Sequence, residues 1–235
     1  MSHSAGAQSD TAYDSYLVEE WNAFQSDRLR TTALLKESEH LKVKRVLDIG
    51  CGAGQEMHPF ISTGAIGVGI DLERTAARVG KRMYENVGLA DKVHFLCARG
   101  ERMPFESGYF DVVICRVALM YMDNKAALAE ISRVLRHEGI FFLKYHAPQY
   151  YWKKLADGLR TGQFKSSIHA ARVLLAGSFY SFTGRQSFSR VSASGEIYQT
   201  ARALSREFTQ VGMRIRSEMP DTNPSTPSLI AAKTL

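Results

Sequence analysis

The 235-residue sequence predicts an α/β fold with a mostly parallel sheet that is covered by helices on both faces. Short apolar runs alternate along the chain with stretches of helical periodicity, which is typical of repeated strand–helix units. The runs are continuously apolar rather than alternately polar, as expected for strands buried on both faces. The hydrophobic content of 45% is enough for a substantial core and excludes a wholly disordered or fibrous protein.

The N-terminal segment, residues 1–42, is predicted to be a tail followed by a helical cap. Residues 1–12 are mostly small and polar and are expected to form a loose tail. From residue 13 to about residue 41 the periodicity is helical. The amphipathic face is marked by Tyr16, Leu17, Glu20, Trp21 and Phe24.

The central segment, residues 43–146, carries five predicted strands separated by helices. The strands are expected at residues 45–49, 65–70, 92–97, 110–115 and 139–145. The helices are expected in the gaps between them, at residues 54–62, 73–87 and 124–136. The last of these helices follows Asp123, a predicted N-cap, and Gly139 lies just past its end.

The alternation stops after residue 146. Residues 148–200 are aromatic, basic and rich in glycine and serine, with a helical pattern at residues 168–175. The alternation then resumes, with a helix at residues 203–211 and strands at residues 213–218 and 229–233. We therefore expect residues 147–202 to be an insertion after the fifth strand, and residues 203–235 to complete the core.

The net charge of +6 is confined to this insertion. Between Tyr151 and Arg202 the chain has eight basic and two acidic residues, whereas the rest of the chain has 22 of each. The basic residues are Lys153, Lys154, Arg160, Lys165, Arg172, Arg185, Arg190 and Arg202. The predicted core is therefore neutral, and the excess charge bears on what the insertion contacts.

The cysteines and the chain termini favour a reducing, cytoplasmic setting. Cys51, Cys97 and Cys115 form neither a CxxC ligand pair nor an even disulfide set. No apolar stretch reaches the roughly 18–20 residues that span a bilayer. The first ten residues lack the basic and apolar regions of a secretory signal.

A glycine-rich turn, DIGCGAG at residues 48–54, ends the first predicted strand and precedes a helix. Glycines let the backbone turn sharply and let a ligand approach the main chain. The second strand ends in Asp71, whose carboxylate can accept hydrogen bonds from both hydroxyls of a ribose. The sequence therefore predicts a nucleoside site across these two strand ends. Gln55 stands where a dinucleotide fingerprint has its third glycine, and no P-loop lysine follows.

Four motifs together carry a specific resemblance. In order along the chain they are VLDIGCGAG, GVGIDL, MPFESGYFDVVIC and LRHEGIFFL. The sequence resembles the class I S-adenosylmethionine-dependent methyltransferases, especially the small-molecule branch related to the ubiquinone/menaquinone enzymes. The resemblance covers about residues 43–146 and, more weakly, 203–235. It implies a Rossmann-like, seven-stranded, mostly parallel sheet whose last strand is antiparallel, with a helical lid inserted after strand five.

The resemblance also implies which residues hold the cofactor, S-adenosyl-L-methionine. The methionine part would be lined by Asp48, Gly50, Gly52 and Gly54. Asp71 would bind the ribose, and Leu72 would pack beside the adenine. Arg116, directly after strand four, would lie near the methionine amino group through its backbone.

One position departs from the family pattern. Related enzymes have an aspartate after strand three that accepts a hydrogen bond from the adenine amino group, and this chain has Arg99 there. Gly100 can still offer its backbone N–H to the adenine ring. Glu101 is the remaining candidate for the amino group.

Methyl transfer needs mainly the alignment of nucleophile, methyl and sulfur in a dry cleft, and a general base helps when the acceptor is a hydroxyl or an ammonium. The candidate bases are Tyr121, just beyond strand four, and His146, at the end of strand five. For each of them a role in packing or in the cavity wall is the alternative. No metal site is predicted.

The basic, aromatic insertion allows three interpretations. As a lid over the acceptor site, its cations favour an anionic acceptor. As an amphipathic element, its Trp, Tyr and Lys residues at 150–154 favour a membrane surface. The third is a dimer contact. The lid is the preferred interpretation and the membrane surface the second, and the diluted charge speaks against nucleic acid.

The predicted function is the transfer of a methyl group from S-adenosylmethionine to oxygen or nitrogen of a small, anionic metabolite, with S-adenosyl-L-homocysteine as product. One alternative is a membrane-surface methyltransferase of a quinone-like or lipid acceptor, with carbon as a further target atom. The other is a protein that binds S-adenosylmethionine without catalysis. The oligomeric state is left open.

Overall fold

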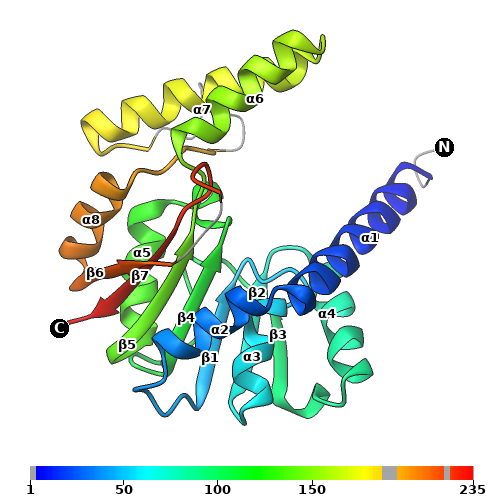
Figure 1. Cartoon of the computed structure of the whole chain (residues 1–235), viewed down its shortest axis with the longest axis vertical. Coiled ribbons are helices and arrows are strands. Elements are labelled where there is room, and N and C mark those ends of the chain that lie inside the picture. Colours follow the sequence, from blue (N-terminus) through cyan, green and yellow to red (C-terminus); the bar gives the residue numbers. More distant parts are fainter. Residues whose placement is uncertain (1–3, 187–194, 220–222, 235) are drawn as a thin grey trace.

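The computed structural model describes residues 4–186, 195–219 and 223–234, and a seven-stranded sheet is its central layer (Figure 1). The strands follow the order β3-β2-β1-β4-β5-β7-β6. They are β1 (Arg45–Ile49), β2 (Ile66–Asp71), β3 (Val93–Cys97), β4 (Phe110–Arg116), β5 (Leu135–Lys144), β6 (Met213–Glu218) and β7 (Ser228–Lys233). The first five pair in parallel, and β7 lies antiparallel between β5 and β6. The predicted seven-stranded sheet with an antiparallel last strand is confirmed.

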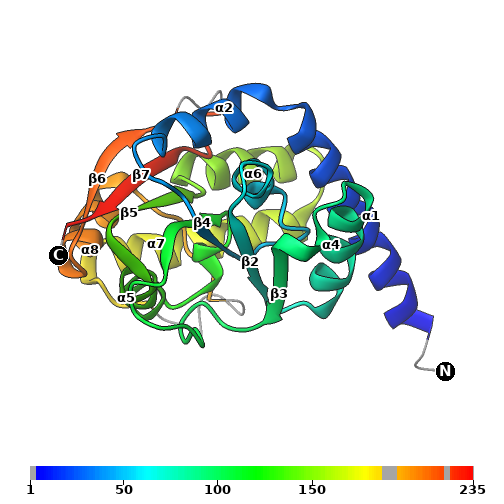
Figure 2. The same ribbon diagram turned by 90° about the horizontal axis from the view of Figure 1, so that it is seen from below.

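Helices cover both faces of the sheet (Figure 2). One face is covered by α1 (Ser4–Ser26), α2 (Arg28–Glu37), α3 (His58–Ser62) and α4 (Arg74–Asn86). The other is covered by α5 (Asn124–Val134) and α8 (Ala201–Gln210). Alternate strand residues point to opposite faces, so Val46 packs into the first core and Leu47 into the second. Short 3-10 helices lie at η1 (Gln55–Met57), η2 (Ala90–Lys92) and η3 (Leu119–Tyr121).

The N-terminal tail is shorter than predicted. α1 begins at Ser4, so residues 4–12 are helical rather than a loose tail, while residues 1–3 lie outside the described residues. The segment is rich in alanine, the strongest helix former, and it continues a helix whose Leu17 and Trp21 are buried against the core. The single helix predicted to reach residue 41 is divided after α1, because the Asp27 side chain caps α2 by accepting from Arg30 N at 3.0 Å.

The boundary between α5 and β5 also differs from the prediction. The helix ends at Val134 and the strand begins at Leu135, so Gly139 lies inside the strand and does not follow the helix. Glu138 has a φ of +60°, and the pairing of β5 with β4 shifts register at this end. Such a bulge cannot be read from an apolar pattern, because the polar residues 136–138 interrupt the apolar run after Leu135. The predicted N-cap is confirmed, since Asp123 accepts from Ala126 N at 2.9 Å.

The predicted insertion is mostly a pair of helices. α6 (Pro148–Arg160) and α7 (Phe164–Thr183) pack against each other beyond the end of β5 and project from the body of the molecule (Figure 1). The helical pattern at residues 168–175 is the middle of α7. Tyr180 ties this helix to α8, because its hydroxyl donates to Glu207 Oε1 at 2.6 Å.

Candidate active site

A cavity of about 650 Å³ lies at the carboxyl ends of β1, β2 and β4, with α1 along one wall. Ligands in open α/β sheets bind at this edge, where the strand order reverses. Ten of the eleven predicted site residues line the cavity: Asp48, Gly50, Gly52, Asp71, Leu72, Gly100, Glu101, Arg116, Tyr121 and His146. Gly54 is not among the lining residues.

The glycine-rich turn after β1 forms one side of the cavity. Gly50 and Gly52 have φ values of +66° and +52°, a conformation that residues with a side chain rarely adopt. A Cβ at Gly50 would collide with the Cβ of Ala118 across the cavity wall. Gly54 lies behind the turn, where its carbonyl accepts from the Tyr84 hydroxyl at 2.8 Å. Gly54 therefore shapes the turn from outside the cavity.

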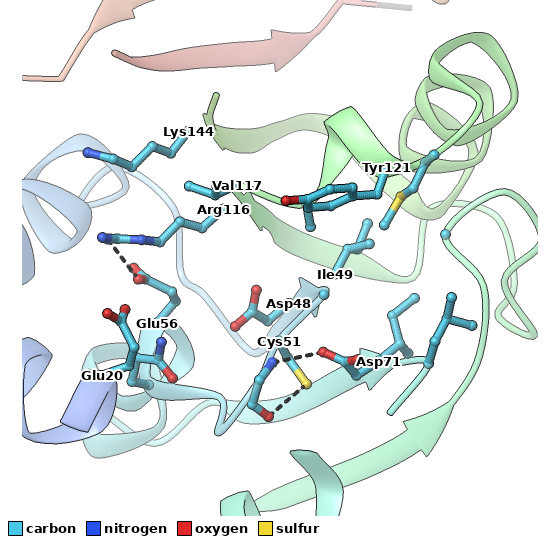
Figure 3. A pocket seen from close by; sticks show the side chains of 18 of the residues that line it. Glu20, Asp48, Ile49, Cys51, Glu56, Asp71, Arg116, Val117, Tyr121 and Lys144 are labelled. Carbon is cyan, nitrogen blue, oxygen red and sulfur yellow. Dashed lines mark hydrogen bonds and ion pairs between the residues drawn. The ribbon is translucent and has the colours of Figure 1, made fainter. Parts of the chain in front are cut away.

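Two carboxylates lie at the base of the cavity (Figure 3). Asp71 accepts hydrogen bonds from Gly52 N and Glu73 N, both at 3.0 Å, which fixes its orientation. Asp48 is buried, and its Oδ2 has no hydrogen-bond partner among the described residues. Burial, and then the charge of Asp71, raises the pKa of Asp48 well above its ordinary value. A carboxylate accepts up to about four hydrogen bonds, so both side chains have capacity for donors on a ligand.

Another part of the cavity is lined by Leu72 and the segment around Gly100. Leu72 is exposed there, which suits contact with a flat aromatic ring. Arg99, the residue that departs from the family pattern, donates from Nη2 to Glu101 Oε1 at 2.9 Å. Asp123 N donates to the same oxygen at 3.3 Å. Glu101 is thus held in place by its neighbours at the rim.

A charged wall joins this cavity to a second one of about 380 Å³. Arg116 donates to Glu56 Oε1 at 3.2 Å (Figure 3). Arg30 Nε donates to Glu56 Oε2 at 3.1 Å. Lys144, the last residue of β5, points to the same side as Arg116 and lines both cavities. Glu56 and Lys144 were not predicted. The position of Lys144, at a strand carboxyl end two residues before His146, is the signal that would have found it.

His146 lies at the end of β5 and ends a buried chain of hydrogen bonds. Its ring stacks on Tyr150 with centroids 3.8 Å apart, and its Nδ1 is 3.2 Å from the Tyr151 hydroxyl. That hydroxyl donates to Glu196 Oε1 at 2.6 Å. Because the Tyr151 proton points to Glu196, the network assigns the His146 proton to Nδ1 and the lone pair to Nε2. Glu196 Oε2 in turn lies 3.0 Å from His169 Nε2. The hydrogen-bonded chain therefore extends to His169, a residue that no sequence pattern singled out.

The two predicted bases have different protonation properties. Burial, and then the nearby Lys154 and Lys144 cations, lowers the pKa of His146 to about 4, so its imidazole is neutral at pH 7. Burial, and then the charge of Glu196, raises the pKa of Tyr121 to about 12. At neutral pH Tyr121 is therefore a hydrogen-bond donor, and His146 offers a lone pair.

The cations predicted to face the acceptor are not in the cavity wall. Lys153, Lys154 and Arg160 do not line it, and Lys153 and Arg160 are exposed on α6. The basic residues that do line it are Arg99, Arg116 and Lys144, all at strand ends or in the loops that follow them. Arg190 lies outside the described residues. The basic side chains of the cavity wall thus belong to the core and not to α6.

Comparison with known proteins indicates a methyltransferase domain and a methyltransferase fold. Residues 47–143 match a protein family described as a methyltransferase domain. The chain is 29% identical over 143 residues to the ubiquinone/menaquinone biosynthesis C-methyltransferase of Blochmanniella floridana, covering 59% of this chain and 56% of that protein. It is 34% identical over 110 residues to the chloroplastic tocopherol O-methyltransferase of Arabidopsis thaliana, covering 46% of this chain and 32% of that one.

A solved structure extends the fold comparison to almost the whole chain. Geranyl diphosphate methyltransferase in complex with S-adenosylmethionine superposes with a TM-score of 0.59 at 19% identity, covering 95% of this chain and 90% of that one. The chain spans only 29% to 56% of the length of the first curated relatives. The resemblance to the class I methyltransferases is confirmed, because residues 47–143 match a methyltransferase-domain family and the fold of the chain is that of a methyltransferase of solved structure.

Proposed function

We propose that this chain binds S-adenosylmethionine in the 650 Å³ cavity and catalyses methyl transfer to oxygen or nitrogen of a small acceptor, because residues 47–143 match a methyltransferase domain. The observation that carries the proposal is the buried Asp48 Oδ2, which has no described partner and lies beside Asp71 in a glycine-lined cavity. Such a site stabilises a ligand that combines positive charge with hydroxyl donors. S-adenosylmethionine has both, and it supplies an activated methyl group on a sulfonium.

The residues that would hold the cofactor occupy distinct parts of the cavity. Asp71 would accept from the ribose hydroxyls while keeping its bonds to Gly52 N and Glu73 N. The carboxylate of Asp48 would stabilise the charged methionine part. Leu72 would contact the adenine, as its exposure at the cavity edge favours.

His146 is proposed as the general base. Its Nε2 would take the proton from the acceptor O–H or N–H, while Nδ1–H donates to Tyr151. The developing imidazolium would then be stabilised by Glu196 through the Tyr151 hydroxyl. A base with a pKa near 4 is weak, so this assistance suits an acceptor whose proton becomes acidic only as the new bond forms.

An anionic acceptor is supported by the charged wall between the two cavities. Arg116 and Lys144 line both of them, which places two cations beside the space next to the cofactor cavity. A carboxylate or phosphate on the acceptor would be recognised there by charge-assisted hydrogen bonds. Arg116 and Lys144, and not the cations of α6, are therefore the reason to expect an anionic acceptor.

A membrane-dissolved, quinone-like or lipid acceptor is the second candidate. It is favoured by a specific observation, the exposed apolar surface of α6 and α7. An amphiphile with an anionic head group would fit both the exposed apolar surface of α6 and α7 and the cations Arg116 and Lys144 of the charged wall.

Isothermal titration with S-adenosylhomocysteine tests the proposal. We expect one-to-one binding by the wild-type protein and loss of at least about 100-fold in affinity for Asp71→Ala, because two charge-assisted hydrogen bonds are removed. Asp157→Ala on α6 is the matched control and should bind like the wild type. No detectable binding by the wild type would contradict the proposal. Tight binding without turnover over a broad panel of hydroxyl and amine acceptors would instead indicate a non-catalytic binder.

A further inference from the structure

The outward face of α7 carries an apolar stripe. Its members are Phe164, Ile168, Leu175, Phe179 and Phe182, which are 48% to 90% exposed. At about 100° per residue, these five positions fall within an arc of about 60° on the helix. Surface helices of globular proteins normally place their charged and polar residues on this side, so the stripe is inverted relative to an ordinary solvated helix.

α6 continues the same kind of surface. Trp152 and Leu159, 60% and 57% exposed, lie within about 20° of each other on the helix. Together with the α7 stripe they make up seven of the fifteen exposed large hydrophobic side chains among the described residues. We refer to these seven residues as the α6–α7 surface. Scattered exposed apolar residues need no explanation, but a concentration on two adjacent helices marks an interaction site.

Buried contacts on the inner side of α6 and α7 fix the orientation of these two helices. Tyr151, Val173 and Leu174 pack together on the inner side of the pair. Tyr180 and Glu207 form a buried hydrogen bond below α7. A rotation that buried the stripe would break these contacts, so the stripe faces outward as a property of the fold.

The charge around the α6–α7 surface indicates its partner. Lys153, Arg160, Lys165 and Arg172 are exposed on the same two helices. Arg172 and Lys165 lie together along one edge of the stripe, at about 80° and 100° from Phe164 on the helix. Asp157 is the one acidic residue between positions 148 and 183, and it lies 3.5 Å from Arg160. A second copy would bring two positively charged surfaces together, whereas an anionic partner would be attracted.

We propose that the α6–α7 surface docks on an anionic phospholipid bilayer. The apolar side chains would enter the boundary between head groups and acyl chains, and the cations beside the stripe would contact the lipid phosphates. Trp152, next to Lys153 and Lys154, has the amphipathic character of residues that anchor at this boundary. None of the described helices is long and apolar enough to span a bilayer, so the contact would lie in the plane of the interface.

Vesicle co-sedimentation tests this inference. The full chain would be mixed with phosphatidylcholine vesicles containing either no phosphatidylglycerol or a large fraction of it. We expect binding to the anionic vesicles that weakens with salt, and little binding to the neutral ones. The variant L175Q/F179Q/F182Q should bind at least about tenfold more weakly, because the area inserted is removed. The variant K165E/R172E should lose the preference for anionic lipid.

A matched control separates the surface from general hydrophobicity. The variant I66Q/V87Q changes two exposed apolar residues outside the α6–α7 surface and should bind vesicles like the wild type. Calorimetry with S-adenosylhomocysteine, with thermal unfolding as a check on folding, should be unchanged in every variant, so this proposal and the proposed function fail independently. Absence of wild-type vesicle binding, or equal binding by the wild type and L175Q/F179Q/F182Q, would overturn the inference. A dimer that this variant dissociates, without vesicle binding, would assign the surface to a second copy instead.

Discussion

The strand-end cavity and the α6–α7 surface both combine charged and apolar groups, but the fold restrains them differently. In the cavity, Asp71 is held by two backbone N–H groups, and Glu56 by two arginines. On the α6–α7 surface, Lys165 and Phe182 extend from a helix into solvent. A site that must fix one small ligand needs side chains with set orientations, while a surface for a fluid partner does not. The following predictions test whether this division of roles is correct.

The largest expected effect is on catalysis at His146. His146→Gln should lower kcat at least about 100-fold with any hydroxyl or amine acceptor that the panel identifies, because the proton acceptor is lost. In the wild type, the rate should be constant from pH 6 to 8 and decline only as the pH approaches the His146 pKa of about 4. The measurement is a pH–rate profile under saturating substrates.

Tyr151→Phe is the companion variant for this prediction. It keeps His146 but removes the hydroxyl that fixes its tautomer, so kcat should fall about tenfold while the KM for the cofactor is unchanged. A pH–rate midpoint near 6.5, or a full rate in His146→Gln, would remove His146 from the mechanism.

Asp48→Asn should weaken cofactor binding and stabilise the free protein. The affinity for S-adenosylmethionine should fall about tenfold, because a charge-assisted contact becomes a neutral one. Burial raises the folded-state pKa of Asp48 above its ordinary value of 3.8, so ionisation of this group opposes folding as the pH rises. The variant should therefore have a higher Tm than the wild type at pH 7, and the difference should disappear below about pH 4. Thermal unfolding across this pH range checks the sign, and a Tm difference independent of pH would contradict it.

Lys144 and the cations of α6 are expected to have different effects on the KM of the acceptor. Lys144→Met should raise the KM of an anionic, water-soluble acceptor about tenfold, because one charge-assisted contact is lost. Reversing the charges of Lys153 and Arg160 together should change this KM by less than about twofold, because both are exposed on α6 and neither lines the cavity. Steady-state kinetics without vesicles provide the test. The opposite pattern would return the acceptor site to α6.

The smallest expected effect concerns two neighbouring leucines on α7. Leu175→Ala should change the free energy of unfolding by less than about 0.5 kcal/mol, because the side chain is 66% exposed. Leu174→Ala should cost about 2–4 kcal/mol, since Leu174 is buried against Tyr151. Urea denaturation of both variants checks the orientation of the helix, and equal costs would mean that the stripe does not face outward.

Much of the fold was predictable because continuous apolar runs and turn residues are local signals. The strands at residues 45–49 and 213–218 have the boundaries that the pattern predicted. The start of β5 was missed because it depends on the left-handed Glu138 and a register shift, which leave no apolar trace. The start of α1 was missed because a helix was expected only where an amphipathic face begins.

The cavity residues were predictable for a similar reason. Asp48, Gly50 and Asp71 lie at or next to the carboxyl ends of predicted strands, and neighbouring parallel strands bring these ends to one edge of the sheet. The contact of Tyr151 with Glu196 joins positions far apart in the sequence, and only the packing of α6 brings them together. The orientation of α6 and α7 was equally hidden, since a basic, aromatic composition fits both a pocket wall and an exposed surface.

A crystal structure of the protein with S-adenosylhomocysteine would show directly whether the strand-end cavity is the cofactor site. We expect the ribose hydroxyls within hydrogen-bonding distance of the Asp71 carboxylate and the homocysteine part beside Asp48 and Gly50. We also expect the space between the ligand sulfur and His146 to be open to an acceptor. Ligand bound in the second cavity near Lys144, or an Asp71 that makes no contact with the ribose, would contradict this assignment of the cavity.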